Sequence, residues 1–214
     1  MQQFKCKDVT LINKETGYSG FFTINKYTLQ HRMFSGEQTR ILHRECFERG
    51  HAVGVLAYDP WKDRVILLEQ FRIGAWVNAL ENSSSSDNSP WLLEVIAGIV
   101  EPGESCQEVA HREAMEEAGC RLLALEPIGD FLSSPGGTSE TTQLYCGCVK
   151  SDGIGGIHGL EEEGEDIRVW VVDFKETVQW LKQGRLNNAS AMIALQWLIL
   201  NHDSIRNKWQ SVVK

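Results

Sequence analysis

Three glutamates lie close together in the sequence at Glu113, Glu116 and Glu117. On a helix, residues three and four positions apart share one face, so these carboxylates would be neighbours. Like charges crowded in this way repel, and hard oxygen ligands so arranged suit Mg²⁺, with Mn²⁺ as a possible substitute. Arg112 supplies one cation, and a metal ion would supply the rest. A metal ion held by a few carboxylates is able to bind pyrophosphate oxygens and orient an attacking water, which predicts phosphoryl-transfer or pyrophosphatase chemistry.

The same segment carries signals for both ends of a helix. Ser105 with Glu108 has the pattern of a capping box, which starts a helix. Gly119 supplies the left-handed residue that ends one. We therefore expect a helix over residues 105–118. A solvated acidic helix face is the usual explanation of such a charge run.

Fixed positions around this helix argue against that alternative. Five residues separate Gly98 from Glu104, and seven residues separate Glu104 from the pair Arg112-Glu113. The pair Glu116-Glu117 and then Gly119 complete the pattern. This pattern resembles the signature box of the Nudix hydrolases. The resemblance implies that Gly98 and its loop meet the helix, that Glu104 pairs with Arg112, and that Gly119 closes the helix.

The resemblance also implies a set of metal ligands. Glu113 and Glu117 would be the principal ligands, joined by the backbone carbonyl of Ala97. Glu116 would be a secondary or water-mediated ligand.

Signals for strands and helices lie on both sides of the box in the sequence. Residues 51–58 and 64–72 flank a turn at Asp59-Pro60 and predict a buried hairpin. Further strands are expected at residues 91–97, 123–131, 143–149 and 167–172, and helices at 174–183 and 188–202. These elements predict an α/β fold with a mixed β-sheet between helices, and the resemblance implies the Nudix fold. Residues 81–90 form a polar, Ser-rich loop with no means of packing.

The N-terminal region reads as short strands broken by Gly17, Gly20 and Ser35-Gly36. These strands are too few to be stable alone, so they must pack on the rest of the chain or on a second copy. We expect residues 1–46 to be a β-rich segment for dimerisation and substrate contact, and residues 47–214 to be the catalytic domain. The expected assembly is a homodimer whose N-terminal segment is exchanged or shared.

Substrate choice has to come from outside the box. A proline-containing run at residues 133–140, downstream of the box, resembles that of ADP-ribose pyrophosphatases, and the resemblance extends over nearly the whole chain. It implies hydrolysis of ADP-ribose to AMP and ribose 5-phosphate, with an adenosine, ribose and phosphate pocket formed by Phe21, Phe22, Arg44, Glu45, Arg49, Arg72, Ile99, Ser134 and Glu140. An aromatic pair can stack on adenine, and arginine forks match phosphate oxygens. For Phe21 and Phe22, one core and one exposed strand residue is an equal alternative, because adjacent strand residues point oppositely.

An acidic loop follows at residues 161–165, between Gly-rich residues and a strand. Such a loop is able to close over a site. The resemblance makes Glu163 the base for the attacking water and lets Glu165 reach a metal ion. Glu162 and Glu165 remain open as alternatives for the base, and so does a merely solvated loop.

Bulk composition limits the possible partners. The net charge of -8 argues against nucleic acid and against an anionic membrane surface. No stretch has the length of a membrane span, and the first residues lack the apolar core of a signal peptide, so we expect a cytoplasmic protein. Its six cysteines are expected to be reduced. Cys146 and Cys148 have no second ligand pair for zinc and are expected to face the core.

Two alternative functions stay open. One keeps the same chemistry on another nucleoside diphosphate sugar, such as ADP-mannose or GDP-mannose. The other is a non-catalytic Nudix module that senses a nucleotide, which the presence of every box carboxylate disfavours.

Overall fold

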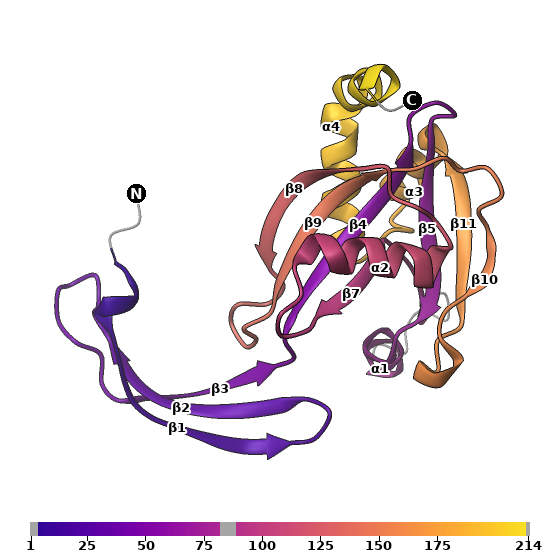
Figure 1. Cartoon of the computed structure of the whole chain (residues 1–214). Helices are drawn as coiled ribbons and strands as arrows, with labels where there is room; N and C mark the ends of the chain where they lie inside the picture. The colour runs from indigo at the N-terminus through magenta and orange to yellow at the C-terminus, as the bar shows by residue number, and fades with distance from the viewer. Residues whose placement is uncertain (1–3, 82–88, 213–214) are drawn as a thin grey trace. The chain divides into compact units, whose positions relative to one another are not determined.

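The computed structural model describes residues 4–81 and 89–212 (Figure 1). The chain divides into two compact units. The first comprises residues 1–51 and 132–141, and the second comprises residues 52–131 and 142–214. Residues 82–88, the centre of the expected Ser-rich loop, lie outside the described residues.

A three-stranded antiparallel sheet forms the first unit. It follows the short helix η1 (Cys6–Asp8) and has the order β1 (Val9–Ser19), β2 (Thr23–His31) and β3 (Leu42–Glu48). Gly17 does not break a strand, contrary to expectation, since it lies inside β1 where the register with β2 shifts at a bulge. Phe21 and Phe22 form the turn between β1 and β2 rather than part of a strand, because Gly20 N–H donates to the Phe22 carbonyl (2.9 Å).

The described residues of the second unit are built around a mixed eight-stranded sheet. Its path is β10 (Gly156–His158), β11 (Ile167–Asp173), β5 (Arg64–Phe71), β4 (His51–Asp59), β9 (Thr141–Cys148) and β8 (Ala124–Leu132). Two short strands join it, β6 (Trp91–Glu94) beside β5 and β7 (Ile96–Val100) beside β4. The expected hairpin is β4 and β5, and the parallel pairing of β4 with β9 makes the sheet mixed, as predicted.

Helices cover both faces of this sheet (Figure 1). On one face, α2 (Cys106–Ala118) packs its Val109, Ala110 and Ala114 against apolar side chains such as Ile66 and Leu68 of β5. On the other face lie α3 (Phe174–Lys182) and α4 (Ala189–Val212). The predicted α/β sandwich is therefore confirmed, and each face of the sheet has its own apolar cluster.

Two helices differ from expectation. The helix α4 runs on to Val212 rather than ending near residue 202, because Ile205 and Trp209 continue its buried face. The helix α1 (Ile73–Glu81) was not expected, and none of its residues is buried.

The cysteines are free thiols, and Cys146 and Cys148 are fully buried in the core as expected. Burial raises the pKa of Cys148 to about 12.

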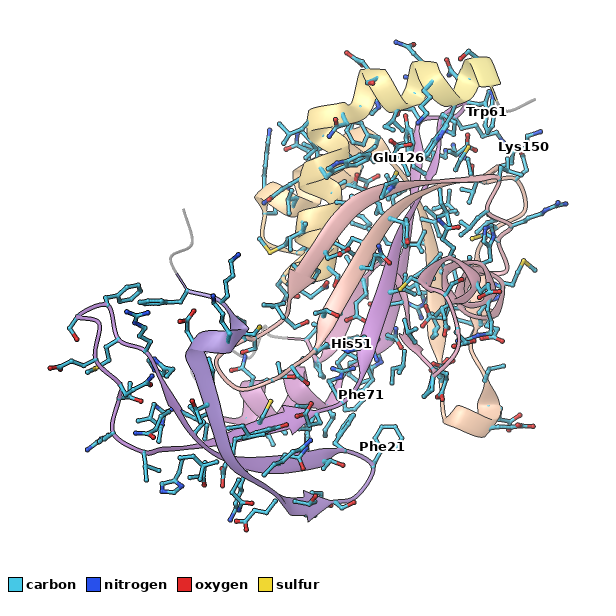
Figure 2. The ribbon with its side chains drawn as sticks, turned by 60° about the vertical axis from the view of Figure 1, so that its left-hand side comes forward. Phe21, His51, Trp61, Phe71, Glu126 and Lys150 are labelled. Carbon is cyan, nitrogen blue, oxygen red and sulfur yellow. The ribbon has the colours of Figure 1, made fainter. Side chains whose placement is uncertain are left out.

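In the described part of the chain, no helix is long and apolar enough to cross a membrane. Trp61 and Lys150 lie at the same end of the sheet in Figure 2, with the ammonium 5.5 Å from the indole centroid.

Candidate active site

The helix α2 begins and ends where the sequence indicates. Ser105 Oγ accepts from Glu108 N–H (3.3 Å), and the Glu108 carboxylate accepts from Ser105 N–H (2.9 Å), which completes the capping box. Gly119 has a φ of 59° and ends the helix in the left-handed conformation. A side chain there would also meet the His158 ring, since a Cβ would lie 2.8 Å from His158 Cε1. Both ends predicted from the sequence are therefore confirmed to within one residue.

Gly98 on β7 leaves room for the Glu113 carboxylate. A Cβ at Gly98 would lie 1.9 Å from Glu113 Oε1 and 2.2 Å from its Cδ. Unbonded carbon atoms pack at roughly 3.5–4.0 Å, so any side chain at this position would displace the carboxylate. Glycine is therefore required at position 98, because any side chain there would occupy the space of the Glu113 carboxylate.

Arg112 lies among the box carboxylates. Its Nη1 donates to Glu113 Oε1 (2.7 Å) and Glu116 Oε2 (3.0 Å), and its Nε lies 3.5 Å from Glu104 Oε1. The charges of these glutamates raise the pKa of Arg112, although burial acts against this. Arg112 thus gathers Glu104, Glu113 and Glu116 around one guanidinium.

Glu117 is the most deeply buried of these glutamates, with 2% of its surface exposed. Its Oε2 accepts a hydrogen bond from Ala97 N–H (2.9 Å), so the backbone of β7 lies directly against it. Burial raises the pKa of Glu117 to about 8, and the charges of Glu113 and Glu165 add to this, while the Ala97 bond and Arg72 oppose it. Burial likewise raises the pKa of Glu113, with Glu116 and Glu165 contributing in the same direction.

Crowded, partly buried carboxylates of this kind fit a divalent cation, because positive charge would relieve both the desolvation and the mutual repulsion. The donors are hard oxygens, which Mg²⁺ and Mn²⁺ prefer. Within residues 4–81 and 89–212, no three His, Cys, Asp or Glu side chains are already gathered around one metal position. In this arrangement Arg112 provides the compensating charge.

The acidic loop reaches the same region through Glu165. Its Oε2 accepts from Leu160 N–H (3.1 Å), and its own N–H donates to the Leu160 carbonyl (3.1 Å), which closes the loop around η2 (Glu161–Glu163). Glu162 is exposed on η2. The backbone of Glu163 belongs to η2, while its side chain lies outside what the structure describes.

Arg72 follows directly after β5 and is oriented by Glu94 on the neighbouring strand. Its Nε donates to Glu94 Oε2 (2.8 Å), and its backbone N–H donates to the Pro90 carbonyl (2.9 Å). Its positive charge partly opposes the rise that burial causes in the pKa of Glu117. Glu94 had no signal in the sequence that marked it, because its contact with Arg72 depends on strand pairing.

The first unit brings together another group of the expected substrate residues. Arg49 lies 3.4 Å from Glu140 Oε1, and its guanidinium lies 5.7 Å from the Phe22 ring centroid. Phe22 contacts Phe21 edge to face (4.7 Å), and Phe21 is 89% exposed at the turn labelled in Figure 2. Phe22 also contacts Phe47 (4.9 Å), which is not among the expected site residues.

Arg44 and Glu45 line a cavity of about 390 Å³ in this unit, opposite the loop of residues 135–138. Ser134 begins that loop, and its carbonyl accepts from the N–H groups of Gly137 (3.0 Å) and Thr138 (2.9 Å). Ile99 belongs to the second unit, where it is partly exposed on β7 beside Gly98. The expected substrate residues therefore fall into two groups, one in each unit.

Residues 48–193 match the NUDIX domain, and the chain belongs to this family. Hydrolases of the family generally use divalent metal ions. The chain is 46% identical over 206 residues to an ADP-ribose pyrophosphatase of Escherichia coli strain K12, covering 96% of this chain and 95% of that protein. It is 43% identical over 210 residues to the ADP-ribose pyrophosphatase of Haemophilus influenzae, covering 98% and 94%.

More distant similarity extends to other proteins. A GDP-mannose pyrophosphatase of Cronobacter sakazakii is 30% identical over 193 residues, covering 90% of this chain and 96% of that protein. A crystal structure of an ADP compounds hydrolase superposes with a TM-score of 0.68 at 21% identity, covering 95% of this chain and all of the other. The latter similarity concerns the fold alone.

Proposed function

We propose that the protein hydrolyses the pyrophosphate bond of ADP-ribose to AMP and ribose 5-phosphate with bound Mg²⁺, which Mn²⁺ can replace. The observation that carries this proposal is the group of box carboxylates on α2, with Glu117 buried against Ala97 and Glu113 seated over Gly98. Identity of 43–46% over nearly the whole chain to ADP-ribose pyrophosphatases supports the choice of substrate.

Metal ions bound there would neutralise charge on the diphosphate and orient the attacking water. Glu113 and Glu117 would hold them together with the Ala97 carbonyl, and Glu116 and Glu165 would assist. Water attacks one phosphorus, and the bond from that phosphorus to the bridging oxygen breaks. Support for the ligand set comes from the oxygen donors and from the buried charge that they concentrate.

Glu163 is proposed as the base that takes the proton of the attacking water, since a positioned carboxylate is suited to this role. Arg72 would bind a phosphate oxygen through its guanidinium, whose Nε is already held by Glu94. Gly98, Glu104, Arg112 and Gly119 would act by shaping the helix and its loop.

The first unit is proposed to supply the adenosine side of the pocket. Phe21 and Phe22 would stack on adenine, with Arg44, Glu45 and Arg49 near the sugars and phosphates. Ile99, Ser134 and Glu140 would complete the pocket. The ion pair of Arg49 with Glu140 and its cation–π contact with Phe22 support this grouping.

We further propose that the protein is a homodimer in which the segment of residues 1–46 is exchanged or shared, while residues 47–214 form the catalytic domain. Asn25 is the only buried residue of the described strands β1 to β3, and apolar side chains such as Leu11 and Tyr18 are exposed. A three-stranded sheet with so little core needs a partner surface. Six free thiols support a reducing compartment such as the cytoplasm.

A second candidate is hydrolysis of GDP-mannose, favoured by the 30% identity to a GDP-mannose pyrophosphatase. The test is release of nucleoside monophosphate from ADP-ribose, ADP-mannose and GDP-mannose at equal concentration, with and without Mg²⁺. We expect ADP-ribose to be preferred and turnover to need the metal ion. A higher kcat/KM for GDP-mannose would replace the proposed substrate, and no turnover of any of them would favour a nucleotide sensor.

A further inference from the structure

Gln70 on β5 carries a buried hydrogen-bond donor that nothing in the described part of the chain accepts. The residue is 5% exposed, and its Nε2 is the buried side-chain polar atom without a partner in residues 4–81 and 89–212. Buried polar groups are almost always paired, and leaving one unpaired destabilises the folded state. Such a group therefore calls for a function that offsets its unfavourable burial.

Strand alternation places Gln70 on the same face of β5 as Ile66 and Leu68. Those two residues belong to the apolar cluster that α2 covers. Gln70 is paired with Leu92 of β6, and Leu68 is paired with Glu94. The amide thus lies on the α2 side of the sheet, where the apolar cluster gives way to charged residues.

The Arg72–Glu94 ion pair spans the position of Gln70. Arg72 lies two residues beyond Gln70, and Glu94 is opposite the residue two before it. The arginine side chain consequently runs back along the strand over the Gln70–Leu92 pair. Glu94 lies three residues before Ala97, whose N–H donates to Glu117 Oε2 (2.9 Å), so this row of side chains continues along the chain toward the box carboxylates.

Two donor groups are therefore available in one place. Arg72 uses its Nε for Glu94, and the Nη groups of the same guanidinium are further donors. Beside it lies the unpaired amide of Gln70. A guanidinium and a neutral amide together match neighbouring oxygens of a phosphate group.

We propose that the Gln70 amide donates a hydrogen bond to a non-bridging oxygen of the substrate diphosphate, next to the contact made by Arg72. This inference rests on the proposed function and adds a binding residue to it. The substrate oxygen would then be the acceptor for this buried donor. Because the oxygen is charged, the bond is stronger than one between neutral groups.

The experiment compares wild type with Gln70→Met, which keeps the length of the side chain and removes the donor, and with Gln70→Leu as a second variant. Gln143→Met is the matched control, because Gln143 is a half-buried glutamine of the same sheet on β9. Melting temperature, kcat and KM for ADP-ribose with Mg²⁺, and inhibition by ADP and by adenosine are measured for each protein.

We expect Gln70→Met to lower kcat/KM by about 10- to 100-fold, as for loss of one hydrogen bond to a charged group. Its melting temperature should stay equal or rise, since an unpaired buried donor has been removed. Inhibition by ADP should weaken by a similar factor while inhibition by adenosine stays unchanged. The control variant should match wild type in all of these measurements.

Unchanged kcat/KM in both Gln70 variants, with an active wild type, would overturn the inference and leave the proposed function intact. A clear loss of melting temperature in both variants would also overturn it, because the amide would then have a partner within the fold. If the wild type fails to hydrolyse ADP-ribose while remaining folded, the proposed function fails, and the inference falls with it.

Discussion

Replacing Gly98 by alanine should disable the enzyme without unfolding it. The added Cβ would lie 1.9 Å from Glu113 Oε1 and 2.5 Å from Glu113 Cγ. Unbonded heavy atoms separate to roughly 3.5 Å, so the Glu113 carboxylate must move by more than about 1 Å. Because the colliding atoms belong to the far end of a flexible side chain, the strand itself is able to stay in place.

The displacement removes Glu113 from its bond to Arg112 (2.7 Å). This ion pair is partly exposed, so its loss should cost about 1 kcal/mol of stability or less. A misplacement of about 1 Å in a catalytic site lowers activity by about 100-fold. We therefore expect kcat/KM for ADP-ribose to fall by about 100-fold or more while the melting temperature changes little.

Gly74→Ala is the matched control, because Gly74 in α1 has no atoms within 4 Å of the added Cβ and ordinary backbone angles. Alanine in a helix is more stable than glycine by roughly 0.5–1 kcal/mol, so this variant should be fully active and slightly more stable. Both variants are assayed by AMP release over a titration of Mg²⁺, together with thermal denaturation. Wild-type activity for Gly98→Ala at all Mg²⁺ concentrations would refute the assigned place of Glu113.

Four further predictions concern single side chains. Glu117→Gln should abolish Mg²⁺-dependent AMP release with the fold intact by circular dichroism, since one ligand charge is lost; residual wild-type rates would contradict the ligand assignment. Glu163→Gln should slow kcat by roughly 10²–10⁴ if this residue is the base, whereas a change in KM alone would make it a binding residue. Glu94→Gln should raise KM more than it lowers kcat, because a neutral amide oxygen accepts more weakly than the carboxylate in the 2.8 Å bond that orients Arg72; an unchanged KM would show that Arg72 needs no charged partner. Asp59 is 1% exposed, and burial acts to raise its pKa. Hydrogen bonds from Lys62, Ser151 and Trp61 outweigh this effect, so the pKa of Asp59 is lower than its usual value. Its contribution to stability is present above the unfolded pKa of about 3.9 and is lost as pH falls through the lower folded value. Urea unfolding should thus show Asp59→Asn less stable than wild type at pH 7, with the difference shrinking below about pH 4, and a difference that persists undiminished in acid would exclude this linkage.

Local signals in the sequence located much of the fold. The capping box at Ser105 and the glycine at residue 119 fixed α2 to within one residue, because both signals act on the backbone groups next to them. The hairpin of β4 and β5 followed from apolar runs on either side of a turn. Where the deciding interaction is local, the prediction was accurate.

Features that depend on distant residues were missed. Ile73, Trp76, Val77 and Leu80 have helical spacing, but no capping residue precedes them, and α1 was not expected. Phe21 and Phe22 have the composition of a strand, while the pairing of β1 with β2 makes them a turn. The bonds of Glu94 and the isolation of Gln70 arise from strand pairing and burial, which no motif in the chain encodes.

The location of the site can also be argued without the box. A folded chain is most stable when each buried polar group is paired and each buried charge is neutralised, and departures from this rule concentrate at functional sites. In the second unit, Glu117 is a buried carboxylate beside other carboxylates, and the buried amide of Gln70 has no acceptor among the residues that the structure describes. Both lie on the α2 side of the sheet, and Arg72 lies next to Gln70 and acts on the charge of Glu117. A diphosphate bound with divalent cations, as proposed above, would supply positive charge to the first group and an oxygen acceptor to the second.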